Sequence, residues 1–352
     1  MATNWVGLDV HEEFCVAAVR DEAGKPVRED RIRSRRADLR RFFRGLGPET
    51  EVAFEAGGSW PWIYDTVRPL VRRVALVHPL KTRLIAEAMI KNDRLDAGHL
   101  SFLLRGNLLF EAYPAPPRAR EGRQLTRGRV RLVRGRAAMC VRIRALLRLH
   151  GVEPPAGVEL FGEKGKTFLR ALALPPNARR TLNSYLSMIE AFDAQIEEFD
   201  AAILEWAKGD ALCKLLQTIP GIGPFTSVLL SCEIGDPGRF ASAGKLCAWA
   251  GLVPRLYSSG ELVRHGPLTK QGNSWIRWVL CECATAAVRS CERFRRLHKR
   301  VQARSGRSCA RAAVAREILT VAYAMMRTGE VFDPQRGSRT PPQPAAPAPP
   351  QV

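Results

Sequence analysis

The chain of 352 residues is longer than one ordinary hydrophobic core needs and predicts two or three domains. With 46% hydrophobic residues it is globular rather than disordered, and its net charge of +20, mostly from arginine, favours a polyanionic partner over a merely basic surface. It contains no run of about 18 uncharged apolar residues and no signal-peptide pattern, so we expect no membrane span. The nine cysteines form no Cys-x-x-Cys pair, which predicts reduced, mostly buried thiols in a cytoplasmic protein.

The first 110 residues predict an α/β domain. Three strands of an antiparallel meander come first, at 4–10, 14–20 and 27–33. Helices and strands then alternate: a basic helix at 36–45, a strand at 52–55, a helix at 60–70, a strand at 73–78 and helices over 80–105. This βββαβαβα order resembles the ribonuclease H fold, and the alternation implies a partly parallel sheet covered by helices.

A proline-rich stretch at 111–117 separates this domain from two long helices. The first, over 118–148, carries eleven arginines against one acid and repeats apolar residues every seven positions: Leu125, Leu132, Met139 and Leu146 in one column, and Val133, Cys140 and Leu147 in another. The second, over about 178–207, has an apolar seam at Leu182, Tyr185, Ile189, Phe192, Ile196, Phe199, Ile203 and Trp206. We expect a basic helix and coiled-coil region over 118–207, in which the helices pair with each other, with a partner chain, or both. The alternative is an ordinary antiparallel hairpin inside one core.

The remaining segments complete the predicted domain organisation. Residues 151–177 are rich in Gly and Pro and favour a loop. A third, mostly helical domain is expected over 210–332. The tail at 333–352 is rich in Pro and Ala, and we expect it to be disordered.

Four acidic residues in the first domain are the strongest candidates for chemistry. Asp9 and Glu55 each end an apolar strand, where catalytic residues of open sheets gather. Asp93 and Asp96 are three residues apart, on one face of an expected helix. Each acid alone is better explained as a solvated surface residue, and Asp93 also as a helix N-cap. The constellation instead predicts a site for Mg²⁺, or Mn²⁺, because carboxylate oxygens are preferred ligands of hard cations and would otherwise repel one another.

A glycine turn between two apolar helices is the second candidate site, with the sequence Ile219-Pro220-Gly221-Ile222-Gly223-Pro224. It resembles a helix-hairpin-helix, in which backbone N–H groups at Gly221 and Gly223 grip a phosphate without reading sequence. The alternative is a plain turn that packs two helices together.

A segment over 251–277 is the third candidate. Ser258 and Ser259 precede Gly260 in what reads as an exposed loop, where most serines only make turns, so spacing alone does not select a nucleophile. Arg264, Lys270 and Arg277 are near enough in sequence to hold phosphate. On the arginine helix, the candidate nucleic-acid contacts are Arg127, Arg131 and Arg134.

These motifs together resemble a DEDD transposase of the insertion-sequence "one-ten" family, relatives of the Piv invertase. The matching stretches occur in family order over roughly 4–332: Val6 to Asp9, Phe54 to Gly58, Lys91 to Ala97, Ile219 to Gly223, Phe240 to Gly251, Tyr257 to Gly260 and Lys270 to Asn273. The resemblance implies that Asp9, Glu55, Asp93 and Asp96 are the four acids of a RuvC-like domain and that Ser259 is the catalytic serine, with Ser258 as a close competitor. Asn92 departs from the family, where threonine is frequent.

The resemblance also implies the activity and the partners. Family members are recombinases that excise and insert their own element, and several use a structured guide RNA. A coiled coil joins subunits, which implies a homo-oligomer, dimer or tetramer, acting on element ends and target DNA. The expected function is therefore DNA cleavage and rejoining through carboxylate-bound Mg²⁺ and a serine nucleophile. The alternatives are a RuvC-like junction resolvase without serine chemistry, a non-catalytic nucleic-acid-binding scaffold, and an actin-like ATPase, for which the phosphate loop after Asp9 is missing.

Overall fold

The computed structural model describes residues 4–79, 93–259, 262–269 and 271–335. Within these ranges only the backbone is described at 93–96, 256–259, 262–265 and 267. The chain divides into two compact units, Met1–Ala115 and Pro116–Val352, here called the N-terminal and C-terminal units. The expected disorder after Asp333 concerns residues that lie almost entirely outside the described ones. Among the described residues, no helix combines the length and the apolar character that crossing a membrane requires.

The N-terminal unit is built on a five-stranded mixed sheet. Its strands are β1 (Asn4–Val10), β2 (Phe14–Arg20), β3 (Pro26–Arg33), β4 (Thr50–Glu55) and β5 (Arg73–Val77). The strand order is β3-β2-β1-β4-β5, in which β1, β2 and β3 pair antiparallel and β4 runs parallel to both β1 and β5. The predicted meander and partly parallel sheet are confirmed, and the order agrees with a ribonuclease H-like arrangement.

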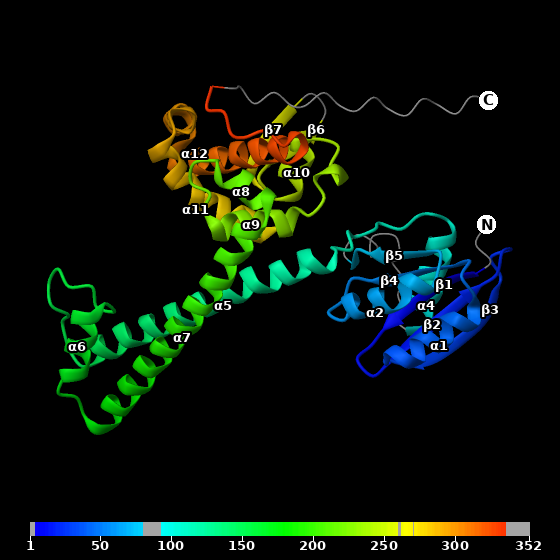
Figure 1. Ribbon diagram of the computed structural model, residues 1–352, viewed down its shortest axis with the longest axis horizontal. Coiled ribbons are helices and arrows are strands. Elements are labelled where there is room, and N and C mark those ends of the chain that lie inside the picture. The colour runs from blue at the N-terminus through cyan, green and yellow to red at the C-terminus, as the bar shows by residue number, and fades with distance from the viewer. Residues whose placement is uncertain (1–3, 80–92, 260–261, 270, 336–352) are drawn as a thin grey trace. The chain divides into compact units, whose positions relative to one another are not determined.

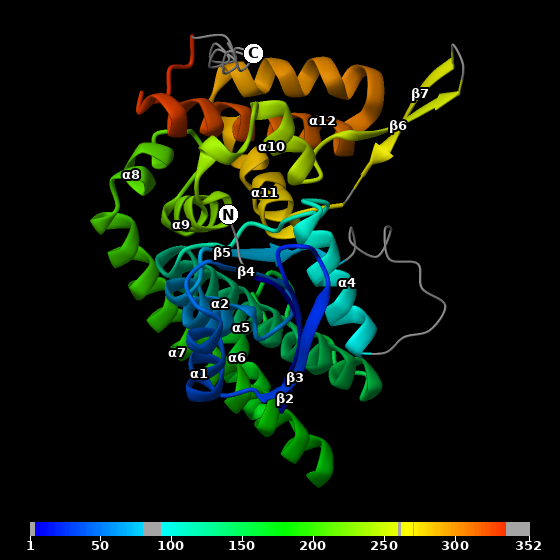
Figure 2. The ribbon, with the colours of Figure 1, turned by 90° about the vertical axis from the view of Figure 1, so that its right-hand side faces the viewer.

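Helices cover both faces of this sheet (Figure 2). They are α1 (Arg36–Leu46), α2 (Trp60–Val67), the short 3₁₀ helix η1 (Arg68–Leu70) and α4 (Asp93–Arg105). Alternate strand residues such as Leu8 and Phe54 pack with α1 and α2, while the residues between them, such as Ala53, pack with Leu100 and Leu104 of α4. The expected α/β class follows from this two-sided burial.

Gly7 in β1 allows α4 to lie directly on the sheet. A Cβ built at Gly7 would lie 1.9 Å from the Ala97 carbonyl oxygen and 2.6 Å from the Ser101 backbone nitrogen. Further along, the Arg105 guanidinium lies over the Trp5 ring at 5.7 Å. The helix therefore runs antiparallel to β1, with its end near Trp5 and its first turn toward the C-terminal end of the strand.

Substituting Gly7 should loosen this contact. We expect Gly7→Ala to lower the free energy of unfolding by about 3 kcal/mol, because the clashing atoms are backbone atoms that cannot rotate away. Urea unfolding measures the effect. Gly45→Ala in α1 is the matched control: its Cβ would meet nothing within 4 Å, so the change should be neutral or stabilising. An equal response at both positions would contradict the close approach.

The C-terminal unit is mostly helical, as expected, with one small sheet (Figure 1). Its elements are α5 (Pro117–Leu149), α6 (Glu163–Ala171), α7 (Pro176–Gly209), α8 (Ala211–Gln217), α9 (Pro224–Ile234), η2 (Pro237–Arg239), α10 (Ala243–Trp249), β6 (Pro254–Ser259), β7 (Leu262–Leu268), α11 (Ser274–Ser290) and α12 (Glu292–Thr328). Two sequence expectations were wrong. The predicted loop at 151–177 contains α6, whose Leu169 is buried, and the predicted serine loop forms the antiparallel strands β6 and β7.

The long helices α5 and α7 lie side by side and antiparallel within one chain. Each of the eight predicted seam residues of α7 is buried or half-buried. On α5, however, the buried positions also include Gly122, Thr126 and Val130, which the search for large apolar residues missed. Pairing of the two helices with each other is thus confirmed, whereas a coiled coil with a partner chain remains a prediction.

Glycines on α5 accommodate aromatic rings from α7. A Cβ at Gly128 would lie 2.7 Å from Phe199, and one at Gly135 would lie 2.6 Å from Phe192. A Cβ at Gly122 would lie 3.3 Å from the Trp206 ring and 2.2 Å from the Cys232 sulfur of α9, so this glycine also serves the packing of α9. The three aromatic residues are seven apart along α7. They meet the three glycines of α5 in the reverse order, as antiparallel helices require.

Arginine–aspartate pairs flank this seam. Arg129 Nε and Nη2 donate to the two carboxylate oxygens of Asp200 at 2.8 and 3.0 Å, and Arg136 forms the equivalent pair with Asp193. The two arginines are seven residues apart on α5, and the two aspartates are seven residues apart on α7. The acidic residues of α7 therefore complement the arginines of α5.

Candidate functional site

Asp9 and Glu55 lie next to each other at the C-terminal ends of two parallel strands. The β1–β4 register pairs Leu8 with Phe54, so the following residues, Asp9 and Glu55, are neighbours across the two strands. Both continue the set of alternate positions that faces α4, since Gly7 and Ala53 contact that helix. The structure therefore brings these two predicted site residues together at one edge of the sheet.

Asp93 and Asp96 belong to the first turn of α4. Because α4 runs antiparallel to β1, this turn lies toward the strand end that carries Asp9. Only the backbone of this turn is described, and among described side chains no group of three or more metal-binding residues occurs. The four-acid set therefore remains a prediction, supported by the direction of α4.

His11 contacts this candidate site and was missed by the sequence reasoning. Its Nε2 lies 2.9 Å from Asp9 Oδ2, and its ring packs on Phe14 at 4.8 Å between centroids. The signal was present in the spacing, because residues two apart near a strand end project to the same face. His11 therefore contacts one carboxylate oxygen of Asp9.

Cys15 of β2 lies beside the candidate site, opposite Val10 of β1. Burial raises the pKa of the Cys15 thiol, and the charge of Asp9 acts in the same direction. The thiol therefore stays protonated at neutral pH, whereas metal ligation and nucleophilic attack require the thiolate. All nine cysteines are free and seven are buried, as predicted; burial raises the pKa of Cys213 to about 11.

The serine segment is a β-hairpin that extends away from the helices of its own unit (Figure 2). Ser258 pairs with Val263 and Ser259 with Leu262, so Ser259 is the last residue of β6, at the tip of the hairpin. Arg264 lies on β7 opposite Tyr257. Lys270 lies outside the described residues. The β6–β7 register therefore sets which of these residues face each other across the hairpin, which a loop would leave open.

Gly272 and Asn273 join the end of the hairpin to α11. Gly272 has φ +93°, and a Cβ there would lie 1.9 Å from the Trp249 carbonyl oxygen, so only glycine fits. Asn273 caps α11 by accepting hydrogen bonds from the backbone N–H groups of Trp275 and Ile276 at 2.9 and 3.1 Å. Its side-chain amide also donates to Glu233 Oε2 at 2.8 Å.

Glu233 of α9 is a buried carboxylate at the centre of this region. Its side chain is 1% exposed, and Arg127 of α5 donates to both of its oxygens, at 2.7 and 2.9 Å. Arg123 adds a second guanidinium 3.6 Å away. This buried network, Arg123–Arg127–Glu233–Asn273, connects the arginine helix with the start of α11. Sequence reasoning missed it, although a single acid inside the apolar run of α9 was a visible signal.

The predicted nucleic-acid contacts differ in their surroundings. Arg127 is already bound by Glu233, so a phosphate would have to compete with a buried carboxylate. Arg131 and Arg134 are exposed, and the Arg134 guanidinium lies 5.5 Å from the centre of the Trp275 ring. Arg277 is half-buried and donates to the Ala250 carbonyl oxygen at 3.2 Å.

The two glycines of the turn between α8 and α9 have different surroundings. A Cβ at Gly221 would lie 2.8 Å from the Cys283 carbonyl oxygen, so this residue serves close packing against α11. Gly223 is exposed, has open space beside it and precedes the first residue of α9. Of the two, Gly223 is the exposed one, and a phosphate contact at this turn remains a prediction.

Comparison with known proteins places these features in a family. A family model described as "Transposase IS116/IS110/IS902 family" matches residues 213–299, and a DEDD transposase model of the IS110 type matches residues 6–151. The first spans the glycine turn, the serine hairpin and the start of α12; the second spans the sheet, α4 and α5.

Individual relatives agree. The chain is 29% identical to a probable family 20 transposase of Pseudomonas aeruginosa, over 73% of this chain and 76% of the relative. It is 27% identical to the transposase for insertion sequence element IS1111A of Coxiella burnetii, over 81% of this chain and 78% of the relative. A pilin gene-inverting protein of Moraxella bovis is 33% identical over 34% of this chain and 38% of its own length. The chain thus belongs to the IS110 family of DEDD transposases, enzymes that cleave and rejoin DNA.

Proposed function

We propose that this transposase cuts and rejoins the strands of an insertion sequence with four carboxylates, Asp9, Glu55, Asp93 and Asp96, and a serine nucleophile, Ser259. The observation that carries the proposal is the adjacency of Asp9 and Glu55 at the ends of parallel β1 and β4, with the first turn of α4 directed to the same strand ends. This edge of an α/β sheet is where catalytic groups gather.

The carboxylates fit a divalent cation by their chemistry and placement. Adjacent strands are about 4.8 Å apart, and two charges about 5 Å apart repel by roughly 3 kcal/mol at an effective dielectric of about 20. Oxygen ligands suit Mg²⁺ or Mn²⁺, which would neutralise this repulsion. A bound ion would polarise the scissile phosphate and stabilise the departing oxygen. His11 would keep Asp9 oriented throughout.

Ser259 would supply the covalent step. Its hydroxyl oxygen forms a bond to phosphorus while the bond between phosphorus and one strand oxygen breaks, and the serine proton ends on the released hydroxyl. The phosphoserine link keeps the energy of the phosphodiester for rejoining. The position of Ser259 at the hairpin tip, after the paired residues of β6, is compatible with access to a strand.

Replacing the serine tests this step. We expect Ser259→Ala to remove any covalent protein–DNA adduct on denaturing gels, because no hydroxyl remains to attack phosphorus. Ser258→Ala is the matched control, one residue earlier on the same strand, and should keep the adduct. An adduct that survives in Ser259→Ala, or disappears only in Ser258→Ala, would assign the nucleophile elsewhere. A junction resolvase would form no adduct in either case.

Nucleic-acid binding is proposed to use exposed arginines of α5, including Arg131 and Arg134, together with Arg264, Lys270, Arg277 and the exposed backbone of Gly223 as part of a helix-hairpin-helix. The partners would be the element DNA and a structured guide RNA. Contacts between α5–α7 hairpins of different subunits would assemble the dimer or tetramer. Exposed apolar side chains on these helices, Val141 and Met188, support such contacts.

A further inference from the structure

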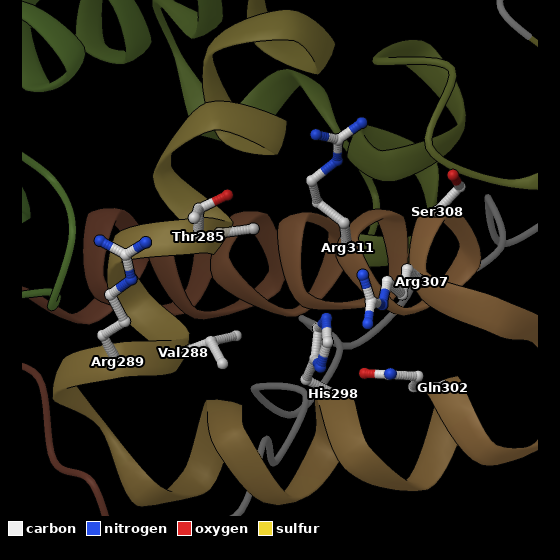
Figure 3. A pocket seen from close by; sticks show the side chains of 9 residues that line it. Thr285, Val288, Arg289, His298, Gln302, Arg307, Ser308 and Arg311 are labelled. Atoms are coloured by element: carbon white, nitrogen blue, oxygen red, sulfur yellow. The ribbon is translucent and has the colours of Figure 1, made fainter. Parts of the chain in front are cut away.

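We propose a second anion site in the C-terminal unit, a pocket that binds a phosphodiester of nucleic acid between α11 and the two halves of α12. The pocket has a volume of 440 Å³ and contains none of the residues assigned above to cleavage or binding (Figure 3). Its lining side chains are Ala284, Thr285, Val288, Arg289, His298, Gln302, Arg307, Ser308 and Arg311. This pocket rests on the proposed function and would be an additional contact between the transposase and its nucleic acid.

A break in α12 creates the pocket. Gly306 has φ 81° and ψ 172°, which interrupts the helix, and a Cβ there would meet nothing within 4 Å. The glycine is therefore needed for its backbone conformation rather than for space. In Figure 3, His298 and Gln302 project from the first half of α12, and Arg307, Ser308 and Arg311 belong to the second half. Helix α11 supplies the third wall.

The charge of the pocket is uncompensated. Arg289, Arg307 and Arg311 are exposed, and among the described residues no carboxylate lines the pocket or pairs with any of the three. The two acids of α12 form ion pairs with arginines outside the pocket: Glu292 pairs with Arg295, and Glu317 pairs with Arg293. Three guanidinium groups around one cavity repel one another, and an anion relieves that repulsion.

The remaining lining groups favour a phosphate that is part of a nucleic-acid strand over a free phosphate ion. Thr285 and Ser308 offer hydroxyl groups, and Gln302 and His298 offer N–H donors, all of which suit phosphate oxygens. Ala284 and Val288 form an apolar wall that a sugar or base can contact. The volume exceeds that of one phosphate group, so a nucleotide unit of a strand fits the site better than free phosphate.

A single introduced acid tests the pocket with all arginines intact. Thr285→Glu places a carboxylate among the guanidiniums and should raise the Kd for nucleic acid by about tenfold. Ala286→Glu is the matched control, since it makes the same charge change at the next exposed position of α11, outside the pocket. Fluorescence anisotropy with a duplex DNA and with a single-stranded RNA of arbitrary sequence gives the affinities of the full-length protein.

Removing positive charge gives an independent measurement. In Arg307→Gln/Arg311→Gln, the slope of log Kd against log salt should become shallower by about one to two. Arg180→Gln/Arg300→Gln removes two exposed arginines outside the pocket and should change the slope less. Circular dichroism checks that each variant is folded.

The outcomes are distinct. A selective effect on DNA or on RNA supports the pocket and identifies the strand that occupies it. Equal losses in pocket and control variants would show general charge attraction and overturn the proposal, as would unchanged binding in Thr285→Glu. Because binding is measured without cleavage, failure of the carboxylate or serine chemistry would leave these results unaffected.

Discussion

Asp9→Asn is expected to lower the rate of strand cleavage by a factor on the order of 10²–10³ or more while leaving nucleic-acid affinity nearly unchanged. The substitution keeps the shape of the side chain but removes a negative charge at the end of β1. The neighbouring Glu55 then faces a weaker cation site. Cleavage of a labelled element end, followed on a gel beside a binding measurement, checks both parts.

A thermal measurement separates a metal ligand from a merely structural acid. Saturating Mg²⁺ should raise the Tm of the wild-type protein, since a ligand at about 100 times its Kd stabilises by about 2.7 kcal/mol, and this rise should shrink in Asp9→Asn. Glu12→Gln is the matched control, an exposed acid in the turn after β1. Cleavage at the wild-type rate in Asp9→Asn, or an equal Mg²⁺ response in all three proteins, would remove Asp9 from the site.

Glu233→Gln should strongly destabilise the C-terminal unit. It leaves the half-buried Arg123 and Arg127 next to a neutral amide, and breaking a buried ion pair on one side costs about 3–5 kcal/mol. We expect the lower end of that range, because the Arg127 side chain is 32% exposed. Urea unfolding measures the loss. Glu197→Gln on α7, an exposed acid, should change stability by less than about 0.5 kcal/mol.

A double variant distinguishes lost pairing from lost packing. Arg127→Leu/Glu233→Leu removes the bidentate pair, while Arg123 keeps its hydrogen bonds to the backbone carbonyls of Cys232 and Glu233. The double variant should therefore cost less than the two single changes added together. The amount of covalent Ser259–DNA adduct can be measured in the same variants. It reports on function because Asn273, which follows the hairpin, donates a hydrogen bond to Glu233. Additive costs in the double variant would contradict the coupling between Arg127 and Glu233.

Features that depend on periodicity and on strand ends could be predicted from the sequence. Short apolar runs made β1, β2 and β4 visible, and the heptad spacing of α7 revealed its packing face. The positions of Asp9 and Glu55 followed because each ends an apolar strand. The resemblance, rather than spacing, singled out Ser259.

Features that depend on small residues and on distant partners could not be predicted. The buried face of α5 includes Gly122 and Thr126, which no search for large apolar residues finds. The β6–β7 hairpin was hidden because its residues do not alternate clearly between apolar and polar. Glu233 could not be assigned a partner, since Arg127 is 106 residues away and only the packing of α5 on α9 brings the two together.

The glycine–aromatic contacts of the α5–α7 hairpin limit how this protein can vary. Sliding one helix by seven residues in one direction would move Phe192 from Gly135 to Arg142 and lose the space that accepts its ring. Sliding it in the other direction would carry Trp206 from Gly122 past the start of α5 at Pro117. The two helices therefore share a single alignment along their length. Insertions or deletions that arise during divergence can be absorbed at the connection around α6, but not within the paired lengths.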